Sequence, residues 1–176
     1  RGLALMPDDV RGLDHQGVCL RELGRLAEAE RAHRRSIELA PNDAGLHNNL
    51  GIALVFLGRT TEAIESFSRA TAIEPSRTEA HANLGNALRE IACYSEAHAA
   101  FESALATRPD GAAGWTGLLL NSQFRSDLTR GERFDLHRRF ARQLHAQIGG
   151  QVRPPVIRRQ RRRLHLGYVS SELYEH

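Results

Sequence analysis

Two kinds of side chain in this sequence have the type and spacing to do chemistry. His176 follows a short β-rich run that closes in two serines, and an imidazole there could accept or relay the proton of a hydroxyl group. Asn49 and Asn83 stand 34 positions apart, and each carboxamide offers one acceptor and two donors to a peptide backbone. We therefore predict that Asn49 and Asn83 bind substrate. The alternative for the two asparagines is a solvated helix face.

Several other chemistries are excluded or disfavoured by composition. All 24 basic residues are arginine, which excludes a lysine nucleophile or Schiff base within this sequence. The nine histidines lack ligand-like spacing, so no metal or cofactor site is predicted, and His47 and His81 are expected to be packing residues. Cys19 and Cys93 lie far apart and are interpreted as small core residues in a reducing compartment, which favours a cytoplasmic location.

A repeat of 34 residues must position the candidate side chains. Five kinds of residue recur at this spacing. They are Pro7, Pro41, Pro75 and Pro109; Gly17, Gly51 and Gly85; Leu20, Leu54 and Leu88; Glu28, Glu62 and Glu96; and Ala29, Ala63 and Ala97. Between successive prolines lie two amphipathic stretches, divided near Gly24, Gly58 and Ala92. Each unit is therefore predicted to be a helical hairpin, with Asn42–Asp43 or Ser76 capping the helix that follows a proline.

These marks resemble the tetratricopeptide repeat. The second unit meets that family's pattern at His47, Leu50, Gly51, Leu54, Ala63, Phe67, Ala70 and Pro75. The first unit departs from it at His33 and Ser36, where phenylalanine and alanine are usual. The resemblance implies an all-α, right-handed solenoid with three repeats at 8–41, 42–75 and 76–109.

The first residues align with the end of a repeat. Residues 1–7 correspond to residues 35–41, so they are interpreted as the tail of a truncated upstream repeat. The N-terminal face of the first repeat would then lack a packing partner. We expect this face either to fray or to be covered by a second copy of the chain, and the second alternative would make the protein a homodimer.

Residues 110–150 are predicted to be transition and capping helices. Trp115 stands in the aromatic position of a fourth unit, and Thr129 with Glu132 predicts a capping box for the last helix. One face of that helix is apolar and is expected to pack on the solenoid. Its members are Phe134, His137, Phe140, Ala141, Leu144 and Ile148.

The end of the sequence changes character. Residues 151–163 contain two prolines and six arginines, which indicates a basic linker. No aromatic residues alternate with these arginines, so no nucleic-acid partner is predicted. The longest apolar run, residues 52–57, is too short for a membrane helix, so no membrane partner is predicted either. Residues 164–176 are predicted to be the first strand of a truncated α/β (Rossmann-like) domain.

Residues 162–176 resemble the opening of the catalytic region of the O-linked N-acetylglucosamine transferases and their SPINDLY-like relatives. The resemblance implies a protein O-glycosyltransferase that uses UDP-GlcNAc or another nucleotide sugar as donor, with acceptor proteins held on the concave solenoid face. His176 falls on the family motif's histidine, so the resemblance implies that His176 is catalytic. Glu172 and Leu173 replace the motif's usual Asp and Phe. Because the family's donor-binding elements lie further on, these 176 residues alone are expected to transfer no sugar.

The same family places asparagines along its solenoid in the register of Asn49 and Asn83. His15 and Gly117 occupy the equivalent positions of the flanking units, so only two positions follow the pattern. The alternative to the enzyme is a non-enzymatic tetratricopeptide scaffold for protein–protein interaction, in which the strand-like terminus has no catalytic role.

Overall fold

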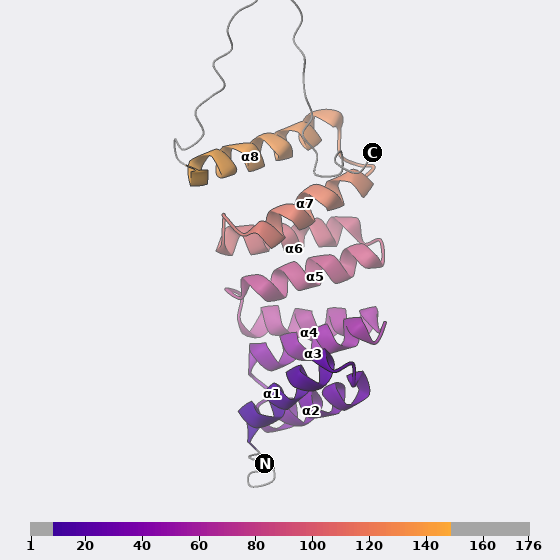
Figure 1. Cartoon of the computed structure of the whole chain (residues 1–176). Helices are drawn as coiled ribbons and strands as arrows, with labels where there is room; N and C mark the ends of the chain where they lie inside the picture. Colours follow the sequence, from indigo (N-terminus) through magenta and orange to yellow (C-terminus); the bar gives the residue numbers. More distant parts are fainter. Residues whose placement is uncertain (1–8, 149–176) are drawn as a thin grey trace, which may run out of the picture.

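The computed structural model describes residues 9–148, which fold into eight α-helices stacked as successive antiparallel pairs (Figure 1). The helices are α1 (Val10–Glu22), α2 (Leu26–Leu39), α3 (Ala44–Phe56), α4 (Thr60–Ile73), α5 (Thr78–Glu90), α6 (Tyr94–Thr107), α7 (Ala112–Phe124) and α8 (Arg130–Ile148). The expectation of an all-α solenoid is confirmed for this part of the chain. The expected linker at 151–163, the strand at 164–176 and His176 lie outside the described residues.

The stack has two layers. We call α1, α3, α5 and α7 the inner layer, because each of these helices contacts the next one in the series. Helices α2, α4 and α6 form the outer layer, and no Cα atom of one comes within 8 Å of another. Since inner helices are closer together than outer ones, the stack curves towards the inner layer. The predicted repeat boundaries at 8–41, 42–75 and 76–109 each enclose one helix pair, and they stay a prediction.

The two helices of a pair approach closely where a glycine faces a ring. A Cβ atom added at Gly51 would lie 2.5 Å from the ring of Phe67, and one added at Gly85 would lie 2.6 Å from the ring of Phe101. Both phenylalanines are almost completely buried. The recurring glycine therefore follows from ring packing, because any larger residue would have to displace the aromatic side chain.

The turns inside the pairs share a left-handed backbone conformation. Gly24 and Gly58 have φ angles of 74° and 72°, and Ala92 has a φ angle of 62° at the corresponding position. The predicted division of the units at these three residues is confirmed. Ala92 adopts this conformation despite its Cβ atom, which strains an L-residue there.

Helix starts agree only in part with the sequence prediction. The carboxylate of Asp43 accepts hydrogen bonds from the amides of Gly45 and Leu46 and caps α3, as expected. The expectation for Ser76 is wrong, because the N-cap of α5 is Arg77 and no side chain caps that helix. The predicted capping box at α8 is confirmed by two reciprocal hydrogen bonds. The Thr129 amide donates to the Glu132 carboxylate at 2.7 Å, and the Glu132 amide donates to the Thr129 hydroxyl at 3.2 Å.

Helix α8 packs on the solenoid with only part of the predicted face. Leu136 is buried, and the ring of Phe140 lies 5.6 Å from that of Trp115. Phe134 and Leu144, which were expected to pack on the solenoid, are 63% and 41% exposed. Arg139 joins the packed side: it binds Glu102 at 2.8 Å and lies over the Trp115 ring. The apolar pattern failed here because a cation and its aromatic partner make part of the contact.

The structure also bears on the two cysteines and on the prediction about a membrane helix. Cys19 is exposed and Cys93 is partly exposed, so the interpretation of Cys19 as a core residue is wrong. Among the helices of residues 9–148, none is long and apolar enough to cross a membrane.

Candidate functional site

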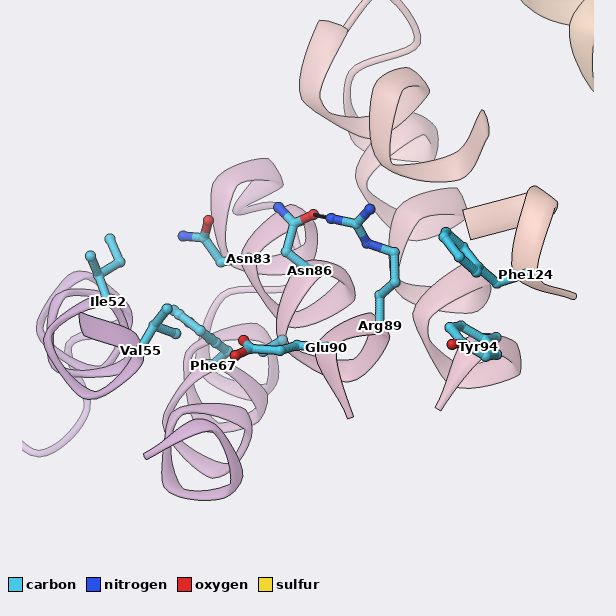
Figure 2. A pocket seen from close by; sticks show the side chains of 10 residues that line it. Ile52, Val55, Phe67, Asn83, Asn86, Arg89, Glu90, Tyr94 and Phe124 are labelled. Carbon is cyan, nitrogen blue, oxygen red and sulfur yellow. Dashed lines mark hydrogen bonds between the residues drawn. The ribbon is translucent and has the colours of Figure 1, made fainter. Parts of the chain in front are cut away.

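A groove of about 530 Å³ opens on the inner layer, across α3, α5 and the C-terminal end of α7 (Figure 2). Ile52 and Val55 of α3 line one end, and Tyr94 with Phe124 line the other. Asn83 and its neighbours on α5 lie between these ends. The groove therefore has apolar ends and a polar centre.

The apolar ends are accessible to a partner. Val55 is 37% exposed and Phe124 is 56% exposed. The rings of Tyr94 and Phe124 stack at 5.6 Å between centroids with 15° between their planes. Each Å² of this exposed apolar surface that a partner covers contributes about 25 cal/mol of favourable binding free energy.

The polar centre carries two amides and two opposite charges. The Arg89 guanidinium donates to the Asn86 side-chain oxygen at 3.4 Å. Glu90 turns its carboxylate the other way, towards Val55 and Phe67 (Figure 2). The charges on neighbouring residues of α5 thus lie on different sides of the groove.

Comparisons with known proteins agree with this architecture. A family model for the tetratricopeptide repeat matches residues 9–76. The crystal structure of MamA has a TM-score of 0.71 at 20% identity, over 82% of this chain and 82% of that one. The described helices form a tetratricopeptide-repeat solenoid.

Two isolated tetratricopeptide domains have the same fold. The Arabidopsis OM64 domain has a TM-score of 0.64 at 19% identity, over 66% of this chain and 96% of that one. The first such domain of Spaghetti (RPAP3), solved with the HSP90 peptide SRMEEVD, has a TM-score of 0.63 at 23% identity, over 65% of this chain and 90% of that one. No curated protein matches the chain.

The solenoid brings one of the two predicted substrate-binding asparagines to the groove. Asn83 lines it, and its Nδ2 donates to the Asn48 side-chain oxygen at 3.0 Å. Asn49 instead points its Nδ2 at the carboxylate of Asp14, at 3.0 and 3.1 Å from the two oxygens. Each amide thus ties its inner helix to the preceding one. Within residues 9–148, neither Asn49 nor Asn83 accepts a hydrogen bond at its Oδ1, so these oxygens remain free for a peptide amide.

The flanking repeat shows why the asparagine pattern stops. At Gly117, an added Cβ atom would collide with the ring of Phe101, so a side chain does not fit between α7 and α6. The asparagine that joins inner helices is therefore replaced by direct ring packing at the last repeat.

Asp14 lies at the centre of a partly buried polar group that the sequence did not reveal. His33, which replaces the phenylalanine of the other repeats, is 1% exposed and places its Nδ1 3.1 Å from the Asp14 carboxylate. Burial raises the pKa of Asp14, but the hydrogen bonds from His33 and Asn49 together with the charge of His33 lower it below its usual value. This group joins α1, α2 and α3.

A recurring hydrogen bond explains the aromatic register of the repeats. In each of three repeats, the ring nitrogen at this register lies beside the carbonyl of the proline six positions earlier. The pairs are His47 with Pro41 at 2.9 Å, His81 with Pro75 at 3.0 Å, and Trp115 with Pro109 at 2.8 Å. An imidazole or indole N–H can donate this bond, so histidine and tryptophan are interchangeable at this position.

The remaining groove residues were missed by the sequence reasoning. The relevant signal lay in the repeat itself, because Phe56, Glu90 and Phe124 share one register of the inner helices. Phe56, at that register, is 63% exposed. A helix that only packs against its neighbours has no use for an exposed phenylalanine, so this register points to a binding surface. Among residues 9–148, no group of three or more histidine, cysteine, aspartate or glutamate residues could hold a metal ion.

Proposed function

We propose that the solenoid is a protein–protein interaction module that binds a peptide segment of its partner in the inner-layer groove. The observation that carries the proposal is the open groove with exposed apolar side chains at both ends, Val55 and Phe124, around the amides of α5. The structural neighbour solved with an HSP90 peptide supports it, because a related solenoid holds a peptide.

The groove has the two ingredients that peptide recognition requires. Its apolar ends can bury side chains of the peptide, which supplies affinity. The free oxygen of Asn83 can accept a backbone N–H of the peptide, which is independent of the peptide's side chains. We keep Asn83 as a peptide-binding residue on this ground. For Asn49, which lies beside Asp14, the same role stays a prediction.

Selection from a random peptide library on the immobilised protein tests the proposal. Val55 in the groove and Leu39 at the end of α2 in the outer layer are matched, with exposures of 37% and 36%. We expect Val55→Asn to weaken the selected peptides by about tenfold, because it removes a buried apolar contact. Leu39→Asn should leave binding unchanged. Equal effects of the two substitutions, or no selected peptide, would reject the groove as the binding site.

A finer proposal is that this module presents acceptor proteins to a glycosyltransferase. It is supported by the resemblance of residues 162–176, including His176, to that catalytic region. Expressing the full gene product and measuring sugar transfer from UDP-GlcNAc to Ser or Thr tests it. Transfer that is lost in His176→Ala would support the proposal. A gene product that is inert with a range of nucleotide sugars would leave the interaction module as the function.

A further inference from the structure

Arg89 is one of the two charged residues that line the groove, with Glu90 beside it on α5. Its one hydrogen bond to a side chain within residues 9–148 goes to neutral Asn86, at 3.4 Å, and no ion pair forms with the described part of the chain. Some other arginines of the solenoid are paired with carboxylates. Arg59 binds Glu30 at 2.8 Å, and Arg139 binds Glu102 at 2.8 Å.

The surroundings of Arg89 leave its positive charge available to a partner. Its guanidinium lies on the side of the groove that faces Asn86 and Phe124, whereas the Glu90 carboxylate lies on the side of Val55 (Figure 2). A peptide that covers the groove removes water from Arg89. An uncompensated cation there would oppose binding, whereas a carboxylate would form charge-assisted hydrogen bonds with it.

We propose that the partner segment carries an acidic side chain, aspartate or glutamate, next to an apolar side chain, and that Arg89 binds the carboxylate while the Tyr94–Phe124 stack holds the apolar group. This inference rests on the proposed function. It adds the chemistry of the partner segment and the end of the groove at which the acidic residue of that segment binds. Because Glu90 repels a carboxylate near Val55, the acidic residue belongs at the α7 end and not at the α3 end.

Peptides selected on the wild-type chain and on Arg89→Gln distinguish this inference from the general proposal. We expect the wild-type selection to be enriched in an acidic residue beside an apolar one, and the Arg89→Gln selection to lose the acidic residue alone. Arg69→Gln is the matched control, because Arg69 is an exposed arginine of α4 in the outer layer. It should reproduce the wild-type selection.

Affinity measurements with one synthetic selected peptide give the second readout. Arg89→Gln should weaken binding by about tenfold. Raising the salt concentration from about 0.05 to about 0.5 M should weaken binding of the wild type and of Arg89→Lys, but not of Arg89→Gln. Glu90→Gln should strengthen binding, since it removes a repelling charge. Circular dichroism of each variant checks that the helices are intact.

The outcomes distinguish the role of Arg89 from the more general proposal that the groove binds a peptide. Selected peptides without an acidic preference, or the same preference and salt dependence in Arg89→Gln, would overturn the role of Arg89 and leave the groove as a peptide site. A wild-type chain that selects no peptide sensitive to Val55→Asn would overturn both.

Discussion

Within residues 9–148, Ala92 is the one residue other than glycine that has a positive φ angle. It lies at φ 62° in a turn where the two earlier repeats have glycine. A left-handed conformation costs an alanine about 1 to 2 kcal/mol in the folded state. Glycine avoids this strain, but it loses more conformational entropy on folding, which offsets part of the gain. We therefore expect Ala92→Gly to raise the free energy of unfolding by about 0.5 to 1 kcal/mol.

Ala99 provides the matched control for that substitution. It is an exposed residue inside α6, where the backbone is helical. Glycine costs about 1 kcal/mol at such a position, so Ala99→Gly should lower the free energy of unfolding. Urea unfolding followed by circular dichroism measures both. A loss of stability in Ala92→Gly would show that the turn carries no strain.

Asp14 gives the solenoid a pH dependence whose sign follows from its pKa. The pKa of Asp14 is lowered in the folded state, by hydrogen bonds from His33 and Asn49 that outweigh burial. The stabilisation is therefore complete above the unfolded pKa of about 3.9 and is lost as the pH falls through the lower folded pKa. We expect Asp14→Asn to cost about 1 kcal/mol at pH 7 and progressively less below about pH 4.

Asp110→Asn is the control for the pH series, because Asp110 is exposed and its carboxylate accepts no hydrogen bond within residues 9–148. Unfolding by urea at several pH values yields the difference in free energy between each variant and the wild type. For Asp110→Asn that difference should stay small throughout. A deficit of Asp14→Asn that is independent of pH would contradict the role given to its carboxylate.

At the scale of the element, the glycine that faces a ring determines how closely two helices pack. An added Cβ atom at Gly51 would lie 2.5 Å from the ring of Phe67, which is buried against α3. Gly51→Ala must therefore displace the ring or separate the helices, and we expect it to cost about 1 to 3 kcal/mol. Thermal unfolding of the variant measures this loss.

The substitution can be paired with a neutral one and with a rescue. At Gly131, at the start of α8, an added Cβ atom would lie 3.8 Å from its nearest neighbour, so Gly131→Ala should be neutral or stabilise by up to about 1 kcal/mol. Phe67→Leu should cost less in the Gly51→Ala background than alone, because the smaller side chain makes room. Additive losses would mean that the two residues do not share one contact.

The elements predicted correctly are those that the 34-residue repeat determines. The helical pairs and their turns at Gly24, Gly58 and Ala92 follow from local sequence and recur in each unit. The cap at Ser76 was wrong, and the packed face of α8 was right at Phe140 but wrong at Phe134 and Leu144. At α8 the contacts come from Arg139 with Trp115 and Glu102, which are far apart in the sequence and invisible to a periodicity of apolar residues.

At the scale of the whole molecule, the groove is a property of neighbouring repeats and of no single one. Val55, Arg89 and Phe124 come from three inner helices, and only their stacking brings them to one surface. The sequence predicted Asn83 there from its register, but it did not show that the amide of Asn49 would turn to Asp14. That difference depends on a side chain of the preceding repeat.

In the proposed function, the inner layer of the solenoid receives the partner. Nuclear magnetic resonance mapping of backbone amide shifts, with a selected peptide added to the protein, tests it most directly. We expect the largest changes in amide chemical shift along α3 and α5 and at the Tyr94–Phe124 end of the groove. Shifts confined to α2, α4 or α8 would place the binding surface elsewhere and contradict it.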